Sequence, residues 1–238
     1  MTNLPLVYAL AAAVANVLGA VAVTSRARWS VRALEAMVAL SAGFLLSVAL
    51  TSLLPEAIAR HGERAAVAAL VGYLLVHLTQ HTLVHHFHFG EETHEVNEAV
   101  GVSALAGLLL HTFFDGVAIA SGFGVSTSVG TLVFLAILLH NLPEGLAISS
   151  IFLAAGAGRG RALGSAGLLG AATVAGVLLA NQVTLLREYG LALSAGVALY
   201  VGASNLVPEF QGKRGWRLPL SFFAGCALYF LAHGLTHQ

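Results

Sequence analysis

The stretch "LLHNLPEGLAISS", residues 138–150, places a histidine, an amide, a proline and a carboxylate within five positions of an otherwise apolar run. Residues 109–121 read "LLHTFFDGVAIAS" and match it at the histidine, at the acid four positions later and at several small residues. Residues four apart lie on the same face of a helix. We therefore expect two helices that bring the same pair of side chains into an apolar environment.

The composition is that of a membrane protein. Of the 238 residues, 58% are apolar and 9% are charged, and the mean hydropathy is +0.85, whereas a soluble domain has about 25% charged residues. A membrane-spanning helix needs roughly 20 mostly apolar residues. We therefore predict an all-α integral membrane protein, a single domain over residues 1–238, with eight transmembrane helices at residues 4–24, 34–59, 65–86, 98–123, 129–155, 161–181, 190–210 and 218–236.

Charge and cysteine content exclude several other classes of protein. The formal net charge is zero and no long basic run occurs, so nucleic acid is not an expected partner. Cys226 is the single cysteine, which excludes an intramolecular disulfide and a thiolate metal cluster. The first apolar run lacks the basic start and the cleavage site of a signal peptide, so we interpret it as a spanning helix.

The basic residues predict the orientation in the membrane, because Arg and Lys concentrate on the cytoplasmic side. Three basic residues lie between helices on one side, at Arg60, Arg64 and Arg187. Eight lie on the other side, at Arg26, Arg28, Arg32, Arg159, Arg161, Lys213, Arg214 and Arg217. The side with eight is expected to be cytoplasmic, which places both termini outside.

Two internal similarities predict an inverted repeat. Residues 41–56, "SAGFLLSVALTSLLPE", match residues 194–209, "SAGVALYVGASNLVPE", without a gap, and residues 109–121 match residues 138–150. The matched helices run in opposite directions in the predicted topology. We therefore expect helices 1–3 to be mirrored by helices 6–8, and helix 4 by helix 5. In transporters built this way, the substrate lies near the membrane midplane between the repeats. Chance similarity among helices rich in Ala, Gly and Leu is the alternative.

The acids in apolar surroundings indicate a cation site. Of the eleven acids, only Asp115 and Glu144 lie near the centre of a predicted span. An ionised carboxylate there costs about 2.5–3.5 kcal/mol, so it needs a partner or a bound cation. His111 and His140 each precede one of these acids by four residues. The alternative is a buried histidine–carboxylate hydrogen bond that joins the two helices.

The neighbouring residues complete a candidate ligand set. Asn141 adds a neutral oxygen, and Pro143 lacks an N–H, so the carbonyl of Leu139 loses its usual helical donor. Two histidines with two carboxylates suit Zn²⁺, Fe²⁺, Cd²⁺ or Mn²⁺ better than Ca²⁺ or Mg²⁺, which prefer oxygen ligands alone. The predicted metal ligands are His111, Asp115, His140, Asn141 and Glu144.

Polar residues elsewhere in the repeat suggest where a cation would enter and leave. Glu56 and Glu209 are matched acids at opposite ends of the molecule, and Ser52 and Asn205 are matched one turn earlier. We expect these four to be entrance, exit or auxiliary residues, with interfacial acids of no further role as the alternative. Thr112, which follows the first site histidine, is a further auxiliary candidate.

The loop at residues 87–97 is rich in histidines and acids and contains no Arg or Lys. His-rich tracts often bind metal, and imidazole and carboxylate suit borderline divalent cations. We expect transient metal collection on the cytoplasmic side by residues in and just before this loop, with an ordinary solvated loop as the alternative; the histidines concerned are His85, His86, His88 and His94.

These motifs resemble those of the ZIP family, the zinc- and iron-regulated-transporter-like proteins, of prokaryotic type. The resemblance is carried by "HTFFDG" (111–116), "HNLPEG" (140–145), "SAGFLLSVALTSLLPEA" (41–57), the His-rich loop and eight spans with external termini. It implies uptake of divalent metal into the cytoplasm through a site between helices 4 and 5. It also implies that the matching residues named above are the ligands.

The chain departs from the family pattern at several positions. Thr112 and Phe114 stand where members commonly carry Asn and often carry Pro. Some members hold a second metal with an acid from helix 6, but no carboxylate occurs here between Glu144 and Glu188. The helix 2 position that would contribute a side chain is Leu45, which does not coordinate metal. We therefore expect one main metal site.

The predicted function is a carrier for divalent cations, Zn²⁺ above Fe²⁺, Cd²⁺ and Mn²⁺, that works by alternating access and needs no catalytic cofactor. It is expected to be a multi-pass protein of a bacterial inner membrane, with metal ions and lipid as partners. Small-residue faces also permit a homodimer. The alternatives are a metal efflux carrier and an intramembrane zinc-dependent hydrolase, although no HExxH motif is present.

Overall fold

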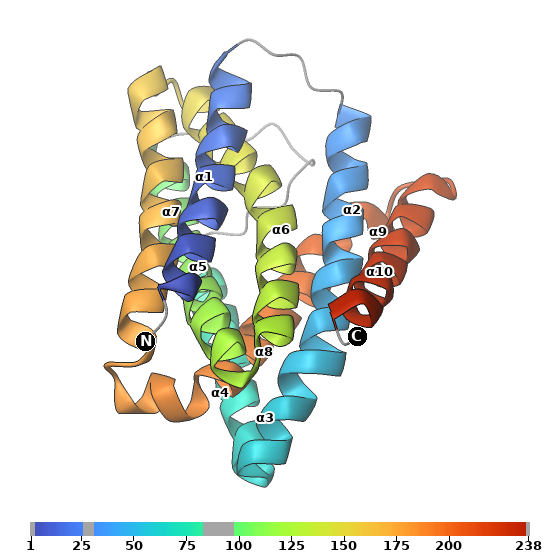
Figure 1. The fold of residues 1–238 in the computed structure, drawn as a ribbon. Helices are drawn as coiled ribbons and strands as arrows, with labels where there is room; N and C mark the ends of the chain where they lie inside the picture. The colour runs from blue at the N-terminus through green and yellow to red at the C-terminus, as the bar shows by residue number, and fades with distance from the viewer. Residues whose placement is uncertain (1–2, 26–30, 83–97, 237–238) are drawn as a thin grey trace.

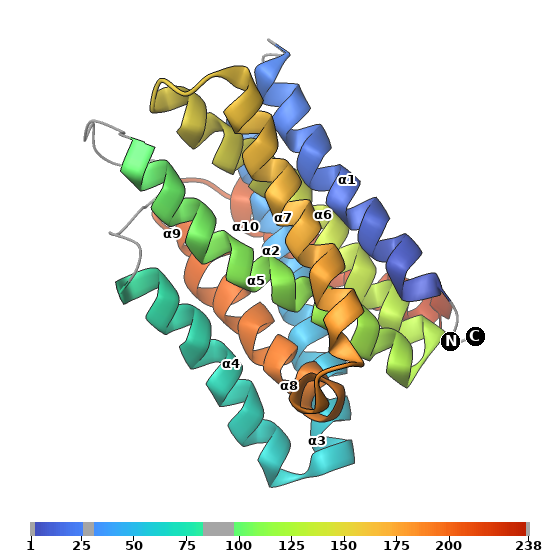
Figure 2. The same cartoon turned by 90° about the vertical axis from the view of Figure 1, so that its left-hand side faces the viewer.

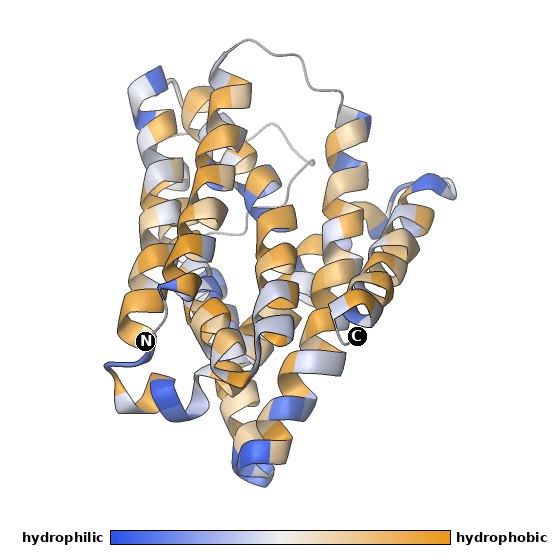
Figure 3. Cartoon of the chain, viewed as in Figure 1, coloured by the Kyte–Doolittle hydropathy of each residue, from blue (hydrophilic) through white to orange (hydrophobic). Residues whose placement is uncertain are grey.

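The computed structural model describes residues 3–25, 31–82 and 98–236, and every regular element among them is helical. The elements are α1 (Leu4–Thr24), α2 (Val31–Val48), η1 (Ala49–Leu53), α3 (Leu54–His61), α4 (Glu63–Thr82), α5 (Glu98–Val125), α6 (Thr127–Ala154), α7 (Arg159–Ala180), α8 (Thr184–Tyr200), η2 (Val201–Leu206), α9 (Pro208–Gln211) and α10 (Arg217–Thr236). Hydrophobic residues cover most of each long helix, and hydrophilic ones collect toward the helix ends (Figure 3). The all-helical prediction is confirmed for these residues.

Among the residues that the structure describes, seven helices are long and apolar enough to cross a membrane, where the sequence predicted eight. The helix α4 is not among the seven; within its described residues, the apolar run from Ala65 to Val76 lies between the charged pair Glu63–Arg64 and His77. The two chain ends lie toward the same end of the molecule (Figures 1 and 2). A chain that crosses a membrane an even number of times has both of its ends on the same side. The eighth span and the external placement of the termini stay predictions.

Two of the long helices each contain one widened, π-helical turn. The first runs through α2, η1 and α3, and the second through α8, η2 and α9. The amide of Leu54 donates to the carbonyl of Ala49, and that of Val207 to Gly202, in both cases directly before a proline. A proline has no N–H, and the wider i→i+5 turn lets the preceding amide pair instead. The repeat from 41–56 to 194–209 aligns the two bonds residue for residue.

The helices form two groups. The α5–α6 group contains α1, α5, α6 and α7, and the α2–α8 group contains α2–η1–α3, α4, α8–η2–α9 and α10 (Figures 1 and 2). The most extensive helix contacts fall within a group: α1 with α6 and α7, α5 with α7, α2 with α10, and α4 with α8. Between the groups, the main contacts are α5 with α8 and α2 with α6.

Reciprocal glycine contacts hold each group together. At each of eight glycines, an added Cβ would overlap a backbone carbonyl oxygen of the facing helix, so only glycine permits the observed approach. The contacts form four pairs: Gly19–Leu142 with Gly145–Asn16, Gly116–Thr173 with Gly176–Phe113, Gly43–Phe222 with Gly225–Leu40, and Gly72–Leu193 with Gly196–Ala69.

The glycine contacts follow the sequence repeat. Gly43 and Gly196 differ by 153 positions, as do Gly72 and Gly225, and this is also the offset between Ser41 and Ser194. The packing of α1 on α6 therefore has the same contact pattern as that of α7 on α5, and the packing of α2 on α10 the same pattern as that of α8 on α4. This correspondence supports the inverted repeat, which we carry forward as a proposal.

Candidate metal site

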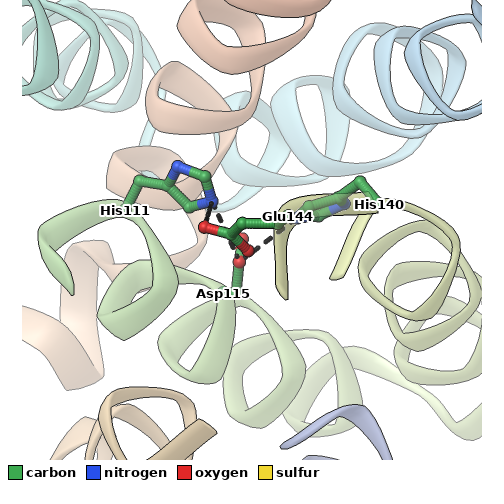
Figure 4. A group of neighbouring side chains, drawn as sticks. All are labelled: His111, Asp115, His140 and Glu144. Carbon is green, nitrogen blue, oxygen red and sulfur yellow. Dashed lines mark hydrogen bonds and ion pairs between the residues drawn. The ribbon is translucent and has the colours of Figure 1, made fainter. Parts of the chain in front are cut away.

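Four polar side chains meet between the midpoints of α5 and α6, each 8% exposed or less. His111 and Asp115 come from α5, and His140 and Glu144 from α6 (Figure 4). One ligand atom from each residue lies within 4.8 Å of all the others. Among the described residues, these four side chains form a group of His, Asp and Glu that could hold a metal ion.

The short distances within the cluster join imidazole nitrogens to carboxylate oxygens. His140 Nε2 lies 3.2 Å from Asp115 Oδ2, and His111 Nε2 lies 3.3 Å from Glu144 Oε1 and 3.6 Å from Asp115 Oδ2. In a tetrahedral site with zinc–ligand bonds of about 2.0–2.2 Å, two ligand atoms are about 3.3–3.6 Å apart. The three separations therefore lie close to the edge length of a tetrahedral zinc site.

The backbone of α6 determines which nitrogen of His140 faces the cluster. His140 Nδ1 lies 2.8 Å from the carbonyl oxygen of Ala136, and a carbonyl only accepts, which assigns the proton to Nδ1. In the neutral ring, Nε2 then presents a lone pair to the carboxylate of Asp115. Two lone pairs at 3.2 Å repel unless a proton or a metal ion lies between them. Donation of the other ring N–H to a carbonyl is the usual arrangement of a metal-binding histidine.

His111 and Glu144 have unsatisfied atoms at the same place. Both ring nitrogens of His111 and Glu144 Oε2 are buried without a hydrogen-bond partner among the described residues. Such atoms are costly in an apolar interior. Thr112 lies beside them: its hydroxyl is 2.6 Å from the carbonyl of Leu108 and 3.3 Å from Glu144 Oε1. Thr112 is therefore positioned to orient the Glu144 carboxylate.

The backbone gap created by Pro143 is filled from another helix. The prediction that the carbonyl of Leu139 lacks its helical donor agrees with the structure, in which the hydroxyl of Ser41 on α2 lies 2.9 Å from that oxygen. The same hydroxyl lies 2.8 Å from the carbonyl of Met37 in its own helix. Since a serine has one proton to donate, it is shared between the two carbonyls. The backbone next to His140 is thus held by the α2–α8 group.

Asn141 is placed differently from the other predicted ligands. It is fully buried, and its Nδ2 donates to the carbonyl of Ala12 on α1 at 3.2 Å. Its Oδ1 has no partner in the described part of the chain. Asn16, one turn after Ala12, is also fully buried, with neither amide atom paired. Sequence reasoning missed Asn16, although an amide within an apolar span is itself the signal.

The four predicted entrance and exit residues lie outside the four-residue cluster. Ser52 is buried in η1 and its hydroxyl lies 2.8 Å from that of Tyr229, so it faces α10. Glu56 on α3 accepts a hydrogen bond from Arg60 at 2.8 Å. Asn205 lies in η2 and Glu209 in α9, each partly exposed. His85, His86, His88, His94 and the loop at 87–97 lie outside the described residues.

Taken with the apolar helices, this cluster defines a class: a multi-pass membrane protein with a buried candidate metal site. The family model of the ZIP zinc transporters matches residues 90–232, which include all four cluster residues. The chain belongs to the ZIP family, which confirms the family resemblance read from its motifs, while the prokaryotic type stays a prediction. A search of curated proteins found no match to the chain.

Family membership establishes the general activity. ZIP proteins transport divalent metal and are transporters rather than enzymes. The seven apolar helices agree with a multi-pass membrane protein. The metal carried, the direction and the mechanism belong to the proposal below.

Proposed function

We propose that this protein takes up divalent transition-metal cations into the cytoplasm, with Zn²⁺ as the best-suited cargo and Fe²⁺, Cd²⁺ and Mn²⁺ as further ones. The observation that carries the proposal is the contact of His140 with Asp115. His140 Nε2 faces a carboxylate oxygen at 3.2 Å, deep inside the protein, and when the ring is neutral with its proton on Nδ1 this nitrogen presents a lone pair. A bound cation turns that repulsion into shared coordination.

Charge supports a divalent cargo. With neutral histidines the cluster carries two negative charges, those of Asp115 and Glu144. One divalent cation neutralises both, whereas a monovalent ion leaves a buried negative charge, which is costly in an apolar interior. Two imidazole nitrogens with two carboxylate oxygens also favour zinc-like cations over Mg²⁺ and Ca²⁺.

The proposed ligands are His111, Asp115, His140 and Glu144. Asn141 joins them when its amide turns from α1, since its Oδ1 has no partner in the described residues. Thr112 acts from outside the ligand shell through its contact with Glu144. The helix that packs across α5 and α6, α7, carries no carboxylate. We therefore propose one main metal site in this transport domain of residues 1–238.

The two helix groups support alternating access. The ligands sit on the α5–α6 group, and the α2–α8 group contacts it chiefly through α8 and α2. Motion between two separately packed helix groups would open a buried site to one side of a membrane at a time. The cation would arrive from the side of Glu56 and leave toward Glu209 and the loop histidines His85, His86, His88 and His94, with Ser52 and Asn205 near its path.

The proposal includes the inverted repeat, with helices 1–3 mirrored by helices 6–8 and helix 4 by helix 5. It also includes eight spans with external termini and a bacterial inner membrane. The repeated glycine contacts and the matched π-helical turns support the repeat. Arg and Lys distribution supports the orientation. The proposal also allows a homodimer that packs through small-residue helix faces. It involves no catalytic cofactor.

Flux measurements in oriented proteoliposomes test the function. Radioactive Zn²⁺ uptake is compared for the wild type, His140→Ala and Glu144→Ala. The control is Ser150→Ala, whose hydroxyl bonds only the carbonyl of Leu146 in its own helix. Losing a ligand should reduce uptake more than about 10-fold, and the control should retain it. Equal flux in all four proteins would refute the site, and flux in the outward direction alone would indicate efflux. Hydrolysis of a peptide by the zinc-loaded protein would instead indicate an enzyme.

A further inference from the structure

Two fully buried asparagines lie where α1 packs on α6, beside the candidate metal site. Asn141 follows His140 on α6, and Asn16 is on α1. The Nδ2 of Asn141 donates to the carbonyl of Ala12 at 3.2 Å, while its Oδ1 has no partner among the described residues. In that part of the chain, neither amide atom of Asn16 is paired. Three amide atoms are therefore buried without a hydrogen bond.

The backbones of α1 and α6 approach closely at these asparagines. An added Cβ at Gly145 would overlap the backbone carbonyl of Asn16, so only glycine permits that contact. One turn earlier on both helices, Asn141 reaches Ala12. In an α-helix the carbonyl of Ala12 accepts the backbone N–H of Asn16. The Nδ2 of Asn141 therefore lies within about 6 Å of the backbone nitrogen of Asn16.

The direction of the Asn16 side chain brings the two amides together. The Cα–Cβ bonds of a helix lean toward its N-terminus, so each side chain lies over the preceding turn. For Asn16 that turn contains Ala12, whose carbonyl holds the Asn141 amide. The other buried residues of α1, a helix that the structure describes in full, are apolar: Ala9, Ala12, Ala15, Gly19 and Ala20. The Asn16 amide is thus directed toward that of Asn141.

Metal coordination by Asn141 creates the need for a new hydrogen-bond acceptor. When its Oδ1 turns onto the cation, its Nδ2 leaves the carbonyl of Ala12. That carbonyl keeps the helical bond from the backbone N–H of Asn16, but Nδ2 becomes a buried donor without an acceptor, which is costly in an apolar interior. The Oδ1 of Asn16 is an unpaired acceptor one turn further along α1. The two unpaired groups are complementary.

We propose that Asn16 is a positioning residue for metal binding, whose Oδ1 accepts the hydrogen bond of Asn141 Nδ2 when Asn141 coordinates the cation. Resting on the proposed transport function, this inference adds a residue of α1 that acts from outside the ligand shell. A packing role alone does not account for Asn16. A polar side chain that joins membrane helices does so through hydrogen bonds, and the Asn16 amide makes none to the described residues.

A double-mutant cycle in zinc affinity tests the proposal. The Kd for Zn²⁺ is measured by isothermal calorimetry in detergent for the wild type, Asn16→Leu, Asn141→Ala and the double variant. Loss of a residue that orients a ligand weakens metal binding by about 10-fold or more, so Asn16→Leu should raise Kd by about that factor. In the Asn141→Ala background the same change should leave Kd unchanged, because no amide remains to be positioned.

Further variants separate positioning from a role in folding. Asn16→Leu replaces an unpaired amide by an apolar group with the same branching, so the melting temperature of the metal-free protein should be kept or raised. In Asn16→Asp an acceptor oxygen remains, so Asn141→Ala should weaken zinc binding there as much as in the wild type. The control is Ser165→Ala on α7, which removes a buried hydroxyl that bonds Ala162 in its own helix. It should leave Kd unchanged.

The outcomes separate this inference from the proposed function. An unchanged Kd in Asn16→Leu, or an equal rise in Kd with and without Asn141, would overturn the positioning role even if zinc flux is normal. A rise of the same size in Ser165→Ala would overturn it as well. If Asn16→Leu does not fold, Asn16→Ala takes its place in the cycle under the same criteria. A wild-type protein that binds no Zn²⁺ refutes the proposed metal site itself, and this inference with it.

Discussion

At the scale of single residues, the candidate site sets function against stability. Asp115 and Glu144 place two carboxylates in an apolar interior, where burying charge without compensation is costly. A cation compensates that cost when it binds, which couples occupancy to stability. Replacing one of these binding residues should therefore be able to raise the free energy of unfolding, at the expense of transport.

Asp115→Asn tests that coupling. Removing one buried charge should keep or raise the melting temperature of the metal-free protein, and should abolish most of the stabilisation that Zn²⁺ gives to the wild type. At a concentration of 100 times Kd, that stabilisation is about 2.7 kcal/mol for one site. Thermal unfolding in detergent with and without Zn²⁺ measures both effects. A variant that still gains the full zinc-dependent shift would show that Asp115 is not a ligand.

Proton competition should make transport depend on pH. Metal binding requires neutral imidazoles at His111 and His140 and ionised carboxylates, so protons and metal compete for the same ligand atoms. Lowering the pH raises the protonated fraction of the ligands, so Zn²⁺ affinity should fall as the pH is lowered. Isothermal calorimetry in buffers of different ionisation enthalpy counts the protons released. Affinity that rises as the pH falls would contradict this assignment.

At the scale of helices, the close contacts depend on glycines rather than on large apolar side chains. The carbonyl of Thr173 on α7 lies where a Cβ of residue 116 on α5 would be, while Gly164 on the same α7 has nothing within 4 Å of that point. Helix packing in lipid relies on such close backbone approach, because the lipid is as apolar as the side chains. The glycine-rich faces therefore set the spacing of the ligand helices.

Gly116→Ala and Gly164→Ala form a matched pair for this argument. In Gly116→Ala the α5–α7 contact must open, which should lower stability by about 1–3 kcal/mol and reduce metal binding, because Asp115 is the adjacent residue. In Gly164→Ala no contact is disturbed, and helix propensity alone should add up to about 1 kcal/mol. Thermal unfolding of both variants checks the difference. Equal stability would show that the α5–α7 approach is not as close as the structure has it.

At the scale of the whole molecule, the charged residues at the helix ends define two sides. The junction of α3 and α4, next to Arg64, lies at the opposite end of the molecule from the junction of α6 and α7, next to Arg159 (Figure 1). Lys213, after α9, lies 2.8 Å from Glu35 near the start of α2. The excess of basic residues on the side of Arg159 and Lys213 predicts that this side faces the cytoplasm.

Cysteine accessibility in intact cells tests that orientation. In a Cys226→Ser background, a membrane-impermeant maleimide should label Arg64→Cys from outside, and should label Arg159→Cys or Gln211→Cys only after the cells are opened. All three positions are exposed, so the difference reports the side of the membrane rather than burial. The reverse pattern would invert the topology and place both chain ends in the cytoplasm.

Much of this protein could be predicted from its sequence, because membrane helices depend on local composition. Most helix bounds in the described residues were predicted within three residues, and those of α1 agree with the structure, whereas α8 begins at Thr184, six residues before the predicted start. The pairing of His111 with Asp115 and of His140 with Glu144 also followed from four-residue spacing within single helices. Repetition of the motif was enough to predict that the two pairs share one site.

What the sequence could not determine depends on contacts between distant segments. Which ring nitrogen of His140 faces Asp115 is decided by the carbonyl of Ala136 and by the packed interior around the ring. The direction of Asn141 toward α1 and the burial of Asn16 require knowing which helices are neighbours. Local composition determined that this chain forms apolar helices bearing a repeated metal-ligand pair. Only tertiary packing decided the register of α5 and α6 against Ser194 and Ser41, because register is set by backbone approach between helices far apart in the chain.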